Sequence, residues 1–328
     1  MTLVVRESEA CVGQADAMAE LALLLVGVGL IVWGAEQFAE HLAAASARLG
    51  VSTFALAVLL AGAEPEELAT AVTAGVRDVP AVAFGDVVGA NVAICLVALA
   101  VGAIIAPLPF TSSTRRYGLL ALPPALAAAV FAWDGRVDRP EGAILVAAYV
   151  AYVAAIWIRE RRPPSLGETA ELDEEHDDEG RVGRDLILVL VGTAAIVVGA
   201  SMLVEAVRRF TDVESDQTTL SLTLVGFATA FELVVLAWSS ARRGITDAVV
   251  AAVVGSYAYN VTMTLGLAAV ITPLGIDDTS ALRGPLLAML ASLAAVLILA
   301  RTHSHLDRRD GVWLLAGYAV FVIAIVAT

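Results

Sequence analysis

The chain has 328 residues, of which 59% are hydrophobic, and a mean hydropathy of +0.81. A soluble core of this size does not need so much apolar surface, and the formal net charge of −14 argues against a nucleic-acid-binding protein. The two cysteines, Cys11 and Cys95, fall in a polar stretch and an apolar one, so they indicate neither a disulfide framework nor a metal-ligand cluster.

Ten apolar blocks follow a polar leader, residues 1–18, which lacks the basic and then apolar pattern of a cleavable signal peptide. The blocks have about the 20 residues that a helix needs to cross the hydrocarbon core. Backbone groups in hydrocarbon must hydrogen-bond within their own segment, so each block is predicted to be a helix. The predicted spans are residues 19–38, 52–76, 80–106, 117–133, 141–158, 185–207, 219–241, 246–271, 280–300 and 311–327. The sequence therefore predicts an all-α, polytopic membrane protein.

Residues 159–184 separate the fifth span from the sixth. Within them, residues 168–179 hold eight acidic side chains, which predicts a solvated linker. A regulatory cation site is the alternative, although the run lacks the ligand spacing of a calcium loop. With the N-terminus outside, 13 of the 20 arginines fall on the inner side. This bias predicts an integral protein of the cell membrane with both termini outside and the acidic linker in the cytoplasm.

The two halves of the chain, residues 19–158 and 185–328, are predicted to be repeats. Landmarks of the first half recur in the second at an offset of 165 or 166 residues. The pairs are Gly34 with Gly199, Glu67 with Glu232, Gly89 with Gly255, and Pro107 with Pro273. Five spans per half is an odd number, so the second half enters the membrane upside down, as in many secondary transporters. Chance similarity between alanine-rich helices is the alternative.

Acidic residues inside the second span are a strong functional signal. An ionisable side chain at bilayer depth costs about 2.5–3.5 kcal/mol on insertion scales, so it usually has a functional partner. Glu64, Glu66 and Glu67 surround Pro65, and a proline within a helix frees backbone carbonyls. Carboxylates and carbonyls are the ligands that hard cations prefer. The alternative is a helix end in a water-filled vestibule.

Further polar residues lie in three other spans. The seventh span has Glu232 at the depth of Glu67, with Thr229 one turn before it. The third span contains Asp86 and Asn91, and the eighth contains Ser256 and Asn260. For Asn260, a packing hydrogen bond is the alternative to a role in ion binding. The candidate cation ligands are Glu67, Glu232, Asp86, Glu64, Glu66, Thr229, Asn91 and Ser256.

These segments resemble the α-repeats of the cation/calcium exchanger superfamily, which includes the sodium/calcium exchangers. The family's first α-repeat carries Gly-Thr-Ser-x-Pro-Glu, then Gly-Asn or Gly-Asp, then Gly-Ser-Asn. The matching positions are Gly62, Glu67, Leu68, Ala69, Thr70, Gly85-Asp86 and Gly89-Ala90-Asn91 in the first half, and Arg243-Gly244, Gly255-Ser256 and Asn260 in the second. The resemblance covers nearly the whole chain.

The resemblance implies that a cation is exchanged against sodium or protons. One acid of each α-repeat forms the centre of the family's site, which maps to Glu67 and Glu232. Hydroxyls and carbonyls before each acid add ligands. An Asn or Asp on the third and eighth spans completes the site, and these positions map to Asp86 and Ala252.

The chain departs from the family pattern in both halves. In the first, Ala63 and Glu64 stand where Thr and Ser would be, and Glu66 takes the place of the proline. A second register pairs Pro65 with the family's proline and makes Glu66 the ligand, but it requires a later gap. In the second half, one hydroxyl and no proline precede the acid, and Tyr257 replaces Asn. The ion specificity of the family therefore does not transfer directly.

Together these features predict a secondary antiporter that exchanges calcium against sodium by alternating access at a carboxylate pair near the bilayer midplane. One alternative is a cation/proton antiporter of the same fold. Another is a membrane binding or scaffold protein with a degenerate ion site, which the thinned second half favours. We find no nucleotide motif and no nucleophile–base pair in a span, so neither an enzymatic activity nor a cofactor is predicted. The expected partners are inorganic cations and the lipid bilayer.

Overall fold

The computed structural model describes residues 19–38, 40–41, 64–160, 182–211, 213–244 and 246–327. The predicted leader and most of the predicted acidic linker lie outside these ranges. Within them, nine helices are long and apolar enough to cross a membrane. The predicted span 52–76 is described only from Glu64 onward, where it forms helix α3 (Pro65–Val76). The prediction of an all-α, polytopic membrane fold is confirmed.

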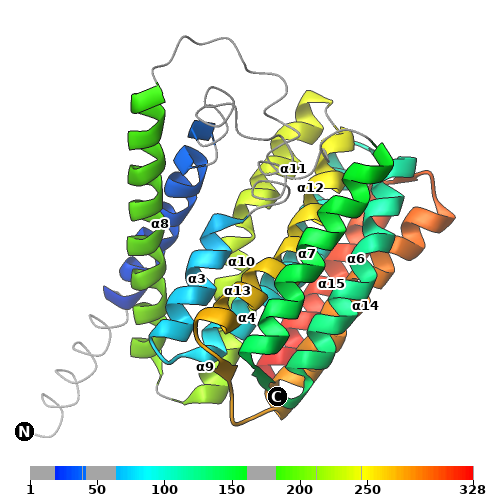
Figure 1. Cartoon of the computed structure of the whole chain (residues 1–328). Helices are drawn as coiled ribbons and strands as arrows, with labels where there is room; N and C mark the ends of the chain where they lie inside the picture. The colour runs from blue at the N-terminus through cyan, green and yellow to red at the C-terminus, as the bar shows by residue number, and fades with distance from the viewer. Residues whose placement is uncertain are drawn as a thin grey trace, which may run out of the picture.

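The elements of the first half begin with a helix at Ala19–Phe38 and continue through α3 to two short strands and two long helices (Figure 1). After α3 they are α4 (Pro80–Ala93), the π-helical turn η1 (Ile94–Ala98), α5 (Leu99–Ile105), β1 (Leu108–Pro109), α6 (Ser112–Phe131), the 3₁₀ turn η2 (Ala132–Asp134), β2 (Arg136–Val137) and α7 (Arg139–Glu160).

The second half repeats this series. Its elements are α8 (Val182–Phe210), α9 (Glu214–Leu220), the π-helical turn η5 (Ser221–Val225), α10 (Gly226–Thr229), α11 (Phe231–Arg243), α12 (Thr246–Tyr259), the π-helical turn η6 (Asn260–Thr264), α13 (Leu265–Ile271), β3 (Leu274–Gly275), α14 (Ser280–Thr302), β4 (His305–Leu306) and α15 (Arg308–Val326). The turns η1 and η6 begin 166 residues apart, as do the strands β1 and β3. The offset read from the sequence therefore holds for the three-dimensional elements.

The strand pairs also reveal the relation between the halves. Strand β1 pairs antiparallel with β4, and β2 pairs antiparallel with β3. Strand β3 is the counterpart of β1, and β4 is the counterpart of β2. When the two halves are exchanged, the pair β1–β4 therefore becomes the pair β3–β2. A pseudo-two-fold relation between inverted halves has this effect, and each small sheet takes one strand from each half.

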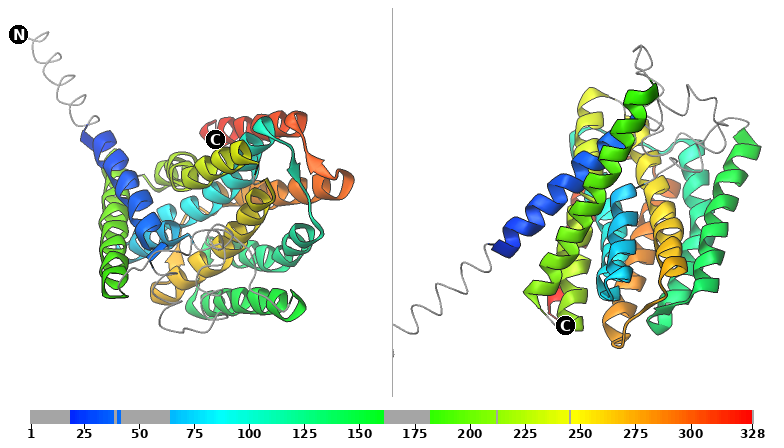
Figure 2. Two further views of the ribbon diagram at one scale, coloured as in Figure 1. Left: turned by 90° about the horizontal axis from the view of Figure 1, so that it is seen from above. Right: turned by 60° about the vertical axis from the view of Figure 1, so that its left-hand side comes forward.

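The helix Ala19–Phe38 and α8 cross closely at the edge of the bundle (Figures 1 and 2). A Cβ on Gly27 would lie 2.9 Å from the carbonyl oxygen of Gly199, and one on Gly34 would lie 2.7 Å from that of Gly192. Small residues let helix backbones approach in this way within a membrane. Gly192 and Gly199 are the counterparts of Gly27 and Gly34 at offset 165, so the crossing itself is antiparallel and two-fold in character.

The most buried spans are corresponding members of the two halves. In the most apolar windows of the spans Pro80–Ile105 and Val249–Ile271, 78% and 94% of the residues are buried, whereas in α15 the share is 17%. Helix α4 packs against α3, α10, η5 and α14, so it lies inside the bundle. Polar residues on α3, α4, α10 and α12 are therefore held away from the lipid.

Candidate cation site

The acids of the second span sit at the start of a described helix. Pro65 is the first residue of α3, and Glu66 and Glu67 belong to its first turn. A proline at this position sacrifices no hydrogen bond, because the first N–H groups of a helix have no partner within it. Our interpretation of Pro65 as a break inside a longer helix therefore finds no support in the described residues. Carboxylates at the start of α3 also benefit from the positive end of its dipole.

Four carboxylates are buried together at this place. Glu64, Glu66, Glu67 and Asp86 each have at most 7% of their surface exposed. Glu67 interacts electrostatically with Asp86, Glu66 and Glu232, and Glu64 interacts with Glu67 and Glu232. The structure thus gathers acids of α3, α4 and α11 from both halves of the chain.

Two hydrogen bonds join the halves across this cluster. The hydroxyl of Thr229, on α10, donates to Oδ1 of Asp86 on α4 at 2.8 Å. The hydroxyl of Ser256, on α12, donates to Oε1 of Glu64. All four side chains are buried. Four of the eight predicted ligands are therefore in direct contact, in pairs that each combine an acid of the first half with a hydroxyl of the second.

The repeat explains where these hydroxyls stand. Thr229 is the counterpart of Glu64 at offset 165, and each of these residues bonds to a partner on the buried span of the other half. The counterpart of Asp86 at offset 166 is Ala252, which has no polar side chain. Ser256 lies one helical turn beyond Ala252 and takes up the bond instead. The second half, which has fewer polar ligands, therefore still contributes a polar contact, one helical turn beyond the position that the repeat predicts.

Asn91 has a different environment from the other predicted ligands. Its amide nitrogen donates to the carbonyl oxygen of Val87 in its own helix at 2.9 Å, and among the described residues Asn91 forms no hydrogen bond with an acid. The amide is buried inside α4 and bonds along that helix. A ligand role for Asn91 stays a prediction.

Two residues that were not among our candidate ligands lie at the acid cluster. Asn260 interacts with the Glu67 carboxylate, and its Oδ1 accepts a hydrogen bond from the hydroxyl of Thr264 at 3.3 Å. Tyr259 interacts with the same group of acids and stands edge-on to Tyr149, with ring centroids 5.3 Å apart. The repeat gave no signal for either, because their counterparts in the first half are apolar. Asn260 was visible in the sequence as an amide within an otherwise apolar span, with a packing hydrogen bond as the alternative to ion binding.

Three acids of the cluster have no basic partner among the described residues. In the part of the chain that the structure describes, no arginine or histidine forms an ion pair with Glu64, Glu67 or Asp86. Buried ionised carboxylates are costly unless they are paired, protonated or bound to a metal ion. Among the described residues, however, no three His, Cys, Asp or Glu side chains converge closely enough to hold a metal ion. The arrangement can attract cations, and a closed coordination cage is not formed in this conformation.

Comparisons with known proteins agree with this architecture. The family model described as "Sodium/calcium exchanger protein" matches residues 19–158 and 185–327. Two similar relatives are the inner membrane protein YrbG of Escherichia coli, 25% identical with 92% of this chain and 95% of the relative covered, and the sodium/calcium exchanger MaX1 of Methanosarcina acetivorans, 25% identical with 92% and 97% covered.

A solved structure of the sodium-calcium exchanger NCX_Mj, soaked with Na⁺ and Sr²⁺, has the same fold. It matches with a TM-score of 0.61 and 20% identity, over 94% of this chain and 98% of that one. Because the family model covers most of the sequence, in both halves and on either side of the linker, the chain belongs to the sodium/calcium exchanger family of secondary transporters.

Proposed function

We propose that this protein is a sodium/calcium antiporter whose central ion-binding pair is Glu67 and Glu232. The observation that carries the proposal is the cluster of carboxylates from both halves, in which Glu64, Glu67 and Asp86 are buried and have no basic partner at ion-pair distance among the described residues. Such a group binds cations to offset its charge, and oxygen ligands suit Ca²⁺ and Na⁺. The relative MaX1 is named a sodium/calcium exchanger, and we extend that assignment to this chain.

Exchange follows from competition for one set of charges. Glu67 and Glu232 come from inverted halves and interact within a single cluster. One divalent cation, or a few monovalent cations, can neutralise such a pair, but both sets cannot be bound together. Rocking of the halves would expose the cluster to each side in turn, so that a sodium gradient drives calcium transport without ATP.

The other candidate ligands have defined roles in this proposal. Asp86 and Glu64 are secondary acids that Thr229 and Ser256 orient across the interface of the halves. Glu66 supplies charge beside Glu67. The membrane orientation proposed with this mechanism has both termini outside the cell and the linker in the cytoplasm, which follows from the arginine bias.

A cation/proton antiporter is the second candidate, and the number of acids favours it. Glu64 occupies a position where the family resemblance implies Ser, and it is buried together with Glu66, Glu67 and Asp86. A buried excess of carboxylates can be neutralised by protons as readily as by metal ions. The transport experiment therefore also measures uptake under an imposed proton gradient.

The test is calcium uptake into proteoliposomes with an imposed outward sodium gradient. We compare the wild type with Glu67→Gln, Glu232→Gln and a control, Asp277→Asn, whose exposed carboxylate lies in the loop between β3 and α14. Sodium-driven uptake should occur in the wild type and the control, and it should be lost in both glutamine variants.

Two other outcomes have definite meanings. Uptake that needs a proton gradient and ignores sodium would replace sodium/calcium exchange by the second candidate. No flux under either gradient, across several cations, would refute transport and leave a membrane protein with a degenerate ion site.

A further inference from the structure

An open hollow lies at the start of α15, far along the chain from the acid cluster. Its volume is about 590 Å³, and it is lined by Asp307, Arg308, Arg309, Val312 and Trp313. Arg308 and Arg309 thus precede Val312 and Trp313 by one turn of the same membrane-spanning helix. The hollow therefore has charged side chains on its membrane-surface side and apolar side chains on its bilayer side.

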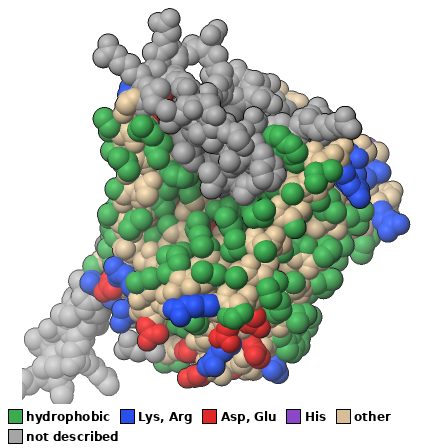
Figure 3. Space-filling model, viewed as in Figure 1, with side chains coloured by type: hydrophobic (Ala, Val, Ile, Leu, Met, Phe, Trp, Pro, Cys, Tyr) green, Lys and Arg blue, Asp and Glu red, His purple; other side chains and the backbone are tan. Residues whose placement is uncertain are grey.

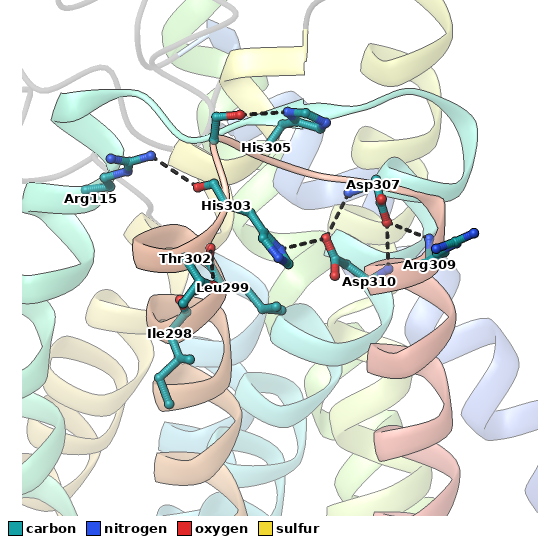
Figure 4. A network of polar contacts seen from close by, with 10 residues as sticks. Arg115, Ile298, Leu299, Thr302, His303, His305, Asp307, Arg309 and Asp310 are labelled. Atoms are coloured by element: carbon teal, nitrogen blue, oxygen red, sulfur yellow. Dashed lines mark hydrogen bonds and ion pairs between the residues drawn. The ribbon is translucent and has the colours of Figure 1, made fainter.

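The acids near this hollow are already engaged by the backbone (Figure 4). Oδ1 of Asp307 accepts from the backbone N–H groups of Arg309 and Asp310 at 2.8 and 3.0 Å. Oδ2 of Asp310 accepts from the backbone N–H of Asp307 at 3.1 Å and lies 3.3 Å from Nδ1 of His303. The hydrogen bond from the Asp310 backbone lowers the pKa of Asp307 below its ordinary value. Asp307 and Asp310 together form the capping box of α15.

The guanidinium groups at the hollow remain available to a ligand. Arg308 and Arg309 are exposed, and among the described residues neither side chain has a carboxylate at ion-pair distance. Arg115, Arg116 and Arg301 lie at the same end of the bundle, where Arg115 donates to the carbonyl oxygen of His303 at 3.2 Å. Figure 3 shows basic side chains gathered at the upper right, whereas acidic and basic side chains are mixed along the lower edge. This end of the molecule is complementary to an anion.

An apolar track continues below the two arginines. Trp313 is 76% exposed, and the exposed residues Val320, Ile323 and Val326 extend along the same helix. Helix α15 is the least buried of the nine spans found among the described residues. An aromatic residue one turn inside a basic pair is typical of the membrane–water interface. A ligand with an anionic head and a hydrocarbon tail would match both parts of this surface.

The corresponding place on the other half lacks these features. Arg139 of α7 is the counterpart of Arg308, and its guanidinium donates to the carbonyl oxygens of Val270 and Ile271 at 3.2 and 3.5 Å. The next residue is Pro140 instead of a second arginine, and Ile144 stands where α15 has Trp313. The start of α7 can therefore serve as a control for the start of α15. Of these two helix starts, only that of α15 has two arginines without a carboxylate partner and an aromatic ring at the membrane surface.

We propose that the hollow at the start of α15 binds the headgroup of an anionic phospholipid, with Arg308 and Arg309 on the phosphate and the acyl chains along the exposed face below Trp313. Lys or Arg side chains near an anionic lipid surface each strengthen binding about five-fold. Two such side chains give a preference for phosphatidylglycerol over phosphatidylcholine of roughly 30-fold. Nothing in this inference depends on which cations are transported.

The experiment measures lipid retention by native mass spectrometry of the full-length protein in phosphatidylglycerol and in phosphatidylcholine. The variant is Arg308→Gln with Arg309→Gln, and the matched control is Arg139→Gln. The wild type and the control should prefer phosphatidylglycerol, and the double variant should lose most of that preference while its gel-filtration profile is unchanged. Fluorescence quenching by brominated phosphatidylglycerol should fall in Trp313→Phe, which places the lipid at this helix.

Three results would overturn the proposal. The first is an undiminished preference in the double variant, and the second is an equal loss in Arg139→Gln, which would indicate a general charge effect. The third is displacement of the lipid by inorganic phosphate, which would make the hollow a site for free anions.

Discussion

The crossing of the first described helix with α8 provides a sharp test of the fold. Changing Gly34→Ala would place a Cβ 2.7 Å from the carbonyl oxygen of Gly192 and 2.9 Å from the backbone nitrogen of Ile196. Ordinary contacts begin near 3.4 Å, so the two backbones would have to separate by about 0.7 Å. Overpacking of this kind costs about 1–3 kcal/mol. Because both obstacles are backbone atoms, rotation of a side chain cannot relieve the clash.

The same helix offers a matched control. Gly29 has no atom within 4 Å of an added Cβ, so Gly29→Ala should only gain helix propensity, up to about 1 kcal/mol. Both variants gain that propensity, so the difference between them isolates the cost of the clash. Equilibrium unfolding in mixed detergent micelles should find Gly34→Ala less stable than Gly29→Ala by about 1–3 kcal/mol. If Gly34→Ala proves equally stable or more stable, the helices do not cross at this glycine.

Two further predictions concern hydrogen bonds described above. Thr229→Val removes the donor to buried Asp86 and should lower the free energy of unfolding by about 1–3 kcal/mol, whereas Thr229→Ser, which keeps the donor, should lose much less; equal losses would show that the bond contributes nothing. The backbone hydrogen bonds that lower the pKa of Asp307 stabilise the folded state above the pKa of an unfolded aspartate, about 3.9, and this contribution is lost as the pH falls through the lower folded value. Thermal midpoints of the wild type and Asp307→Asn should therefore differ at neutral pH and converge below about pH 4; a constant difference would refute the sign.

Hydropathy predicted most of the spans, and its errors lie at polar helix starts. The span predicted at 246–271 coincides with the stretch from Thr246 to Ile271. The span predicted at 117–133 in fact begins at Ser112, because Thr111 caps the helix by accepting from the backbone N–H of Thr114 at 3.1 Å. Polar residues that begin a helix at the membrane surface have a low hydropathy, so a hydropathy average assigns them to the preceding loop. The two-residue strands are too short to leave any periodic signal.

Part of the candidate site was also accessible from the sequence. The offset of 165 residues paired Glu67 with Glu232, and the structure brings these acids into one cluster. The partners of individual side chains were not accessible, because Thr229 meets Asp86 only once the two halves pack together. Asn260 was weighed and not selected, since a packing hydrogen bond explains a buried amide equally well. A comparison of the two halves identifies functional residues that are present in both, and it misses those that are present in only one.

The pairing of β1 with β4 has a consequence for biogenesis. The last strand emerges at His305–Leu306, some 200 residues after its partner at Leu108–Pro109. During synthesis, β1 can therefore pair only after the hairpin of α14, β4 and α15 has been made. Translation that stops before β4 would leave β1 with an open edge and α5 without α15, against which it packs. The first half of the protein is therefore fully packed only once α15 has been inserted, because β1 and α5 both lack their partners until then.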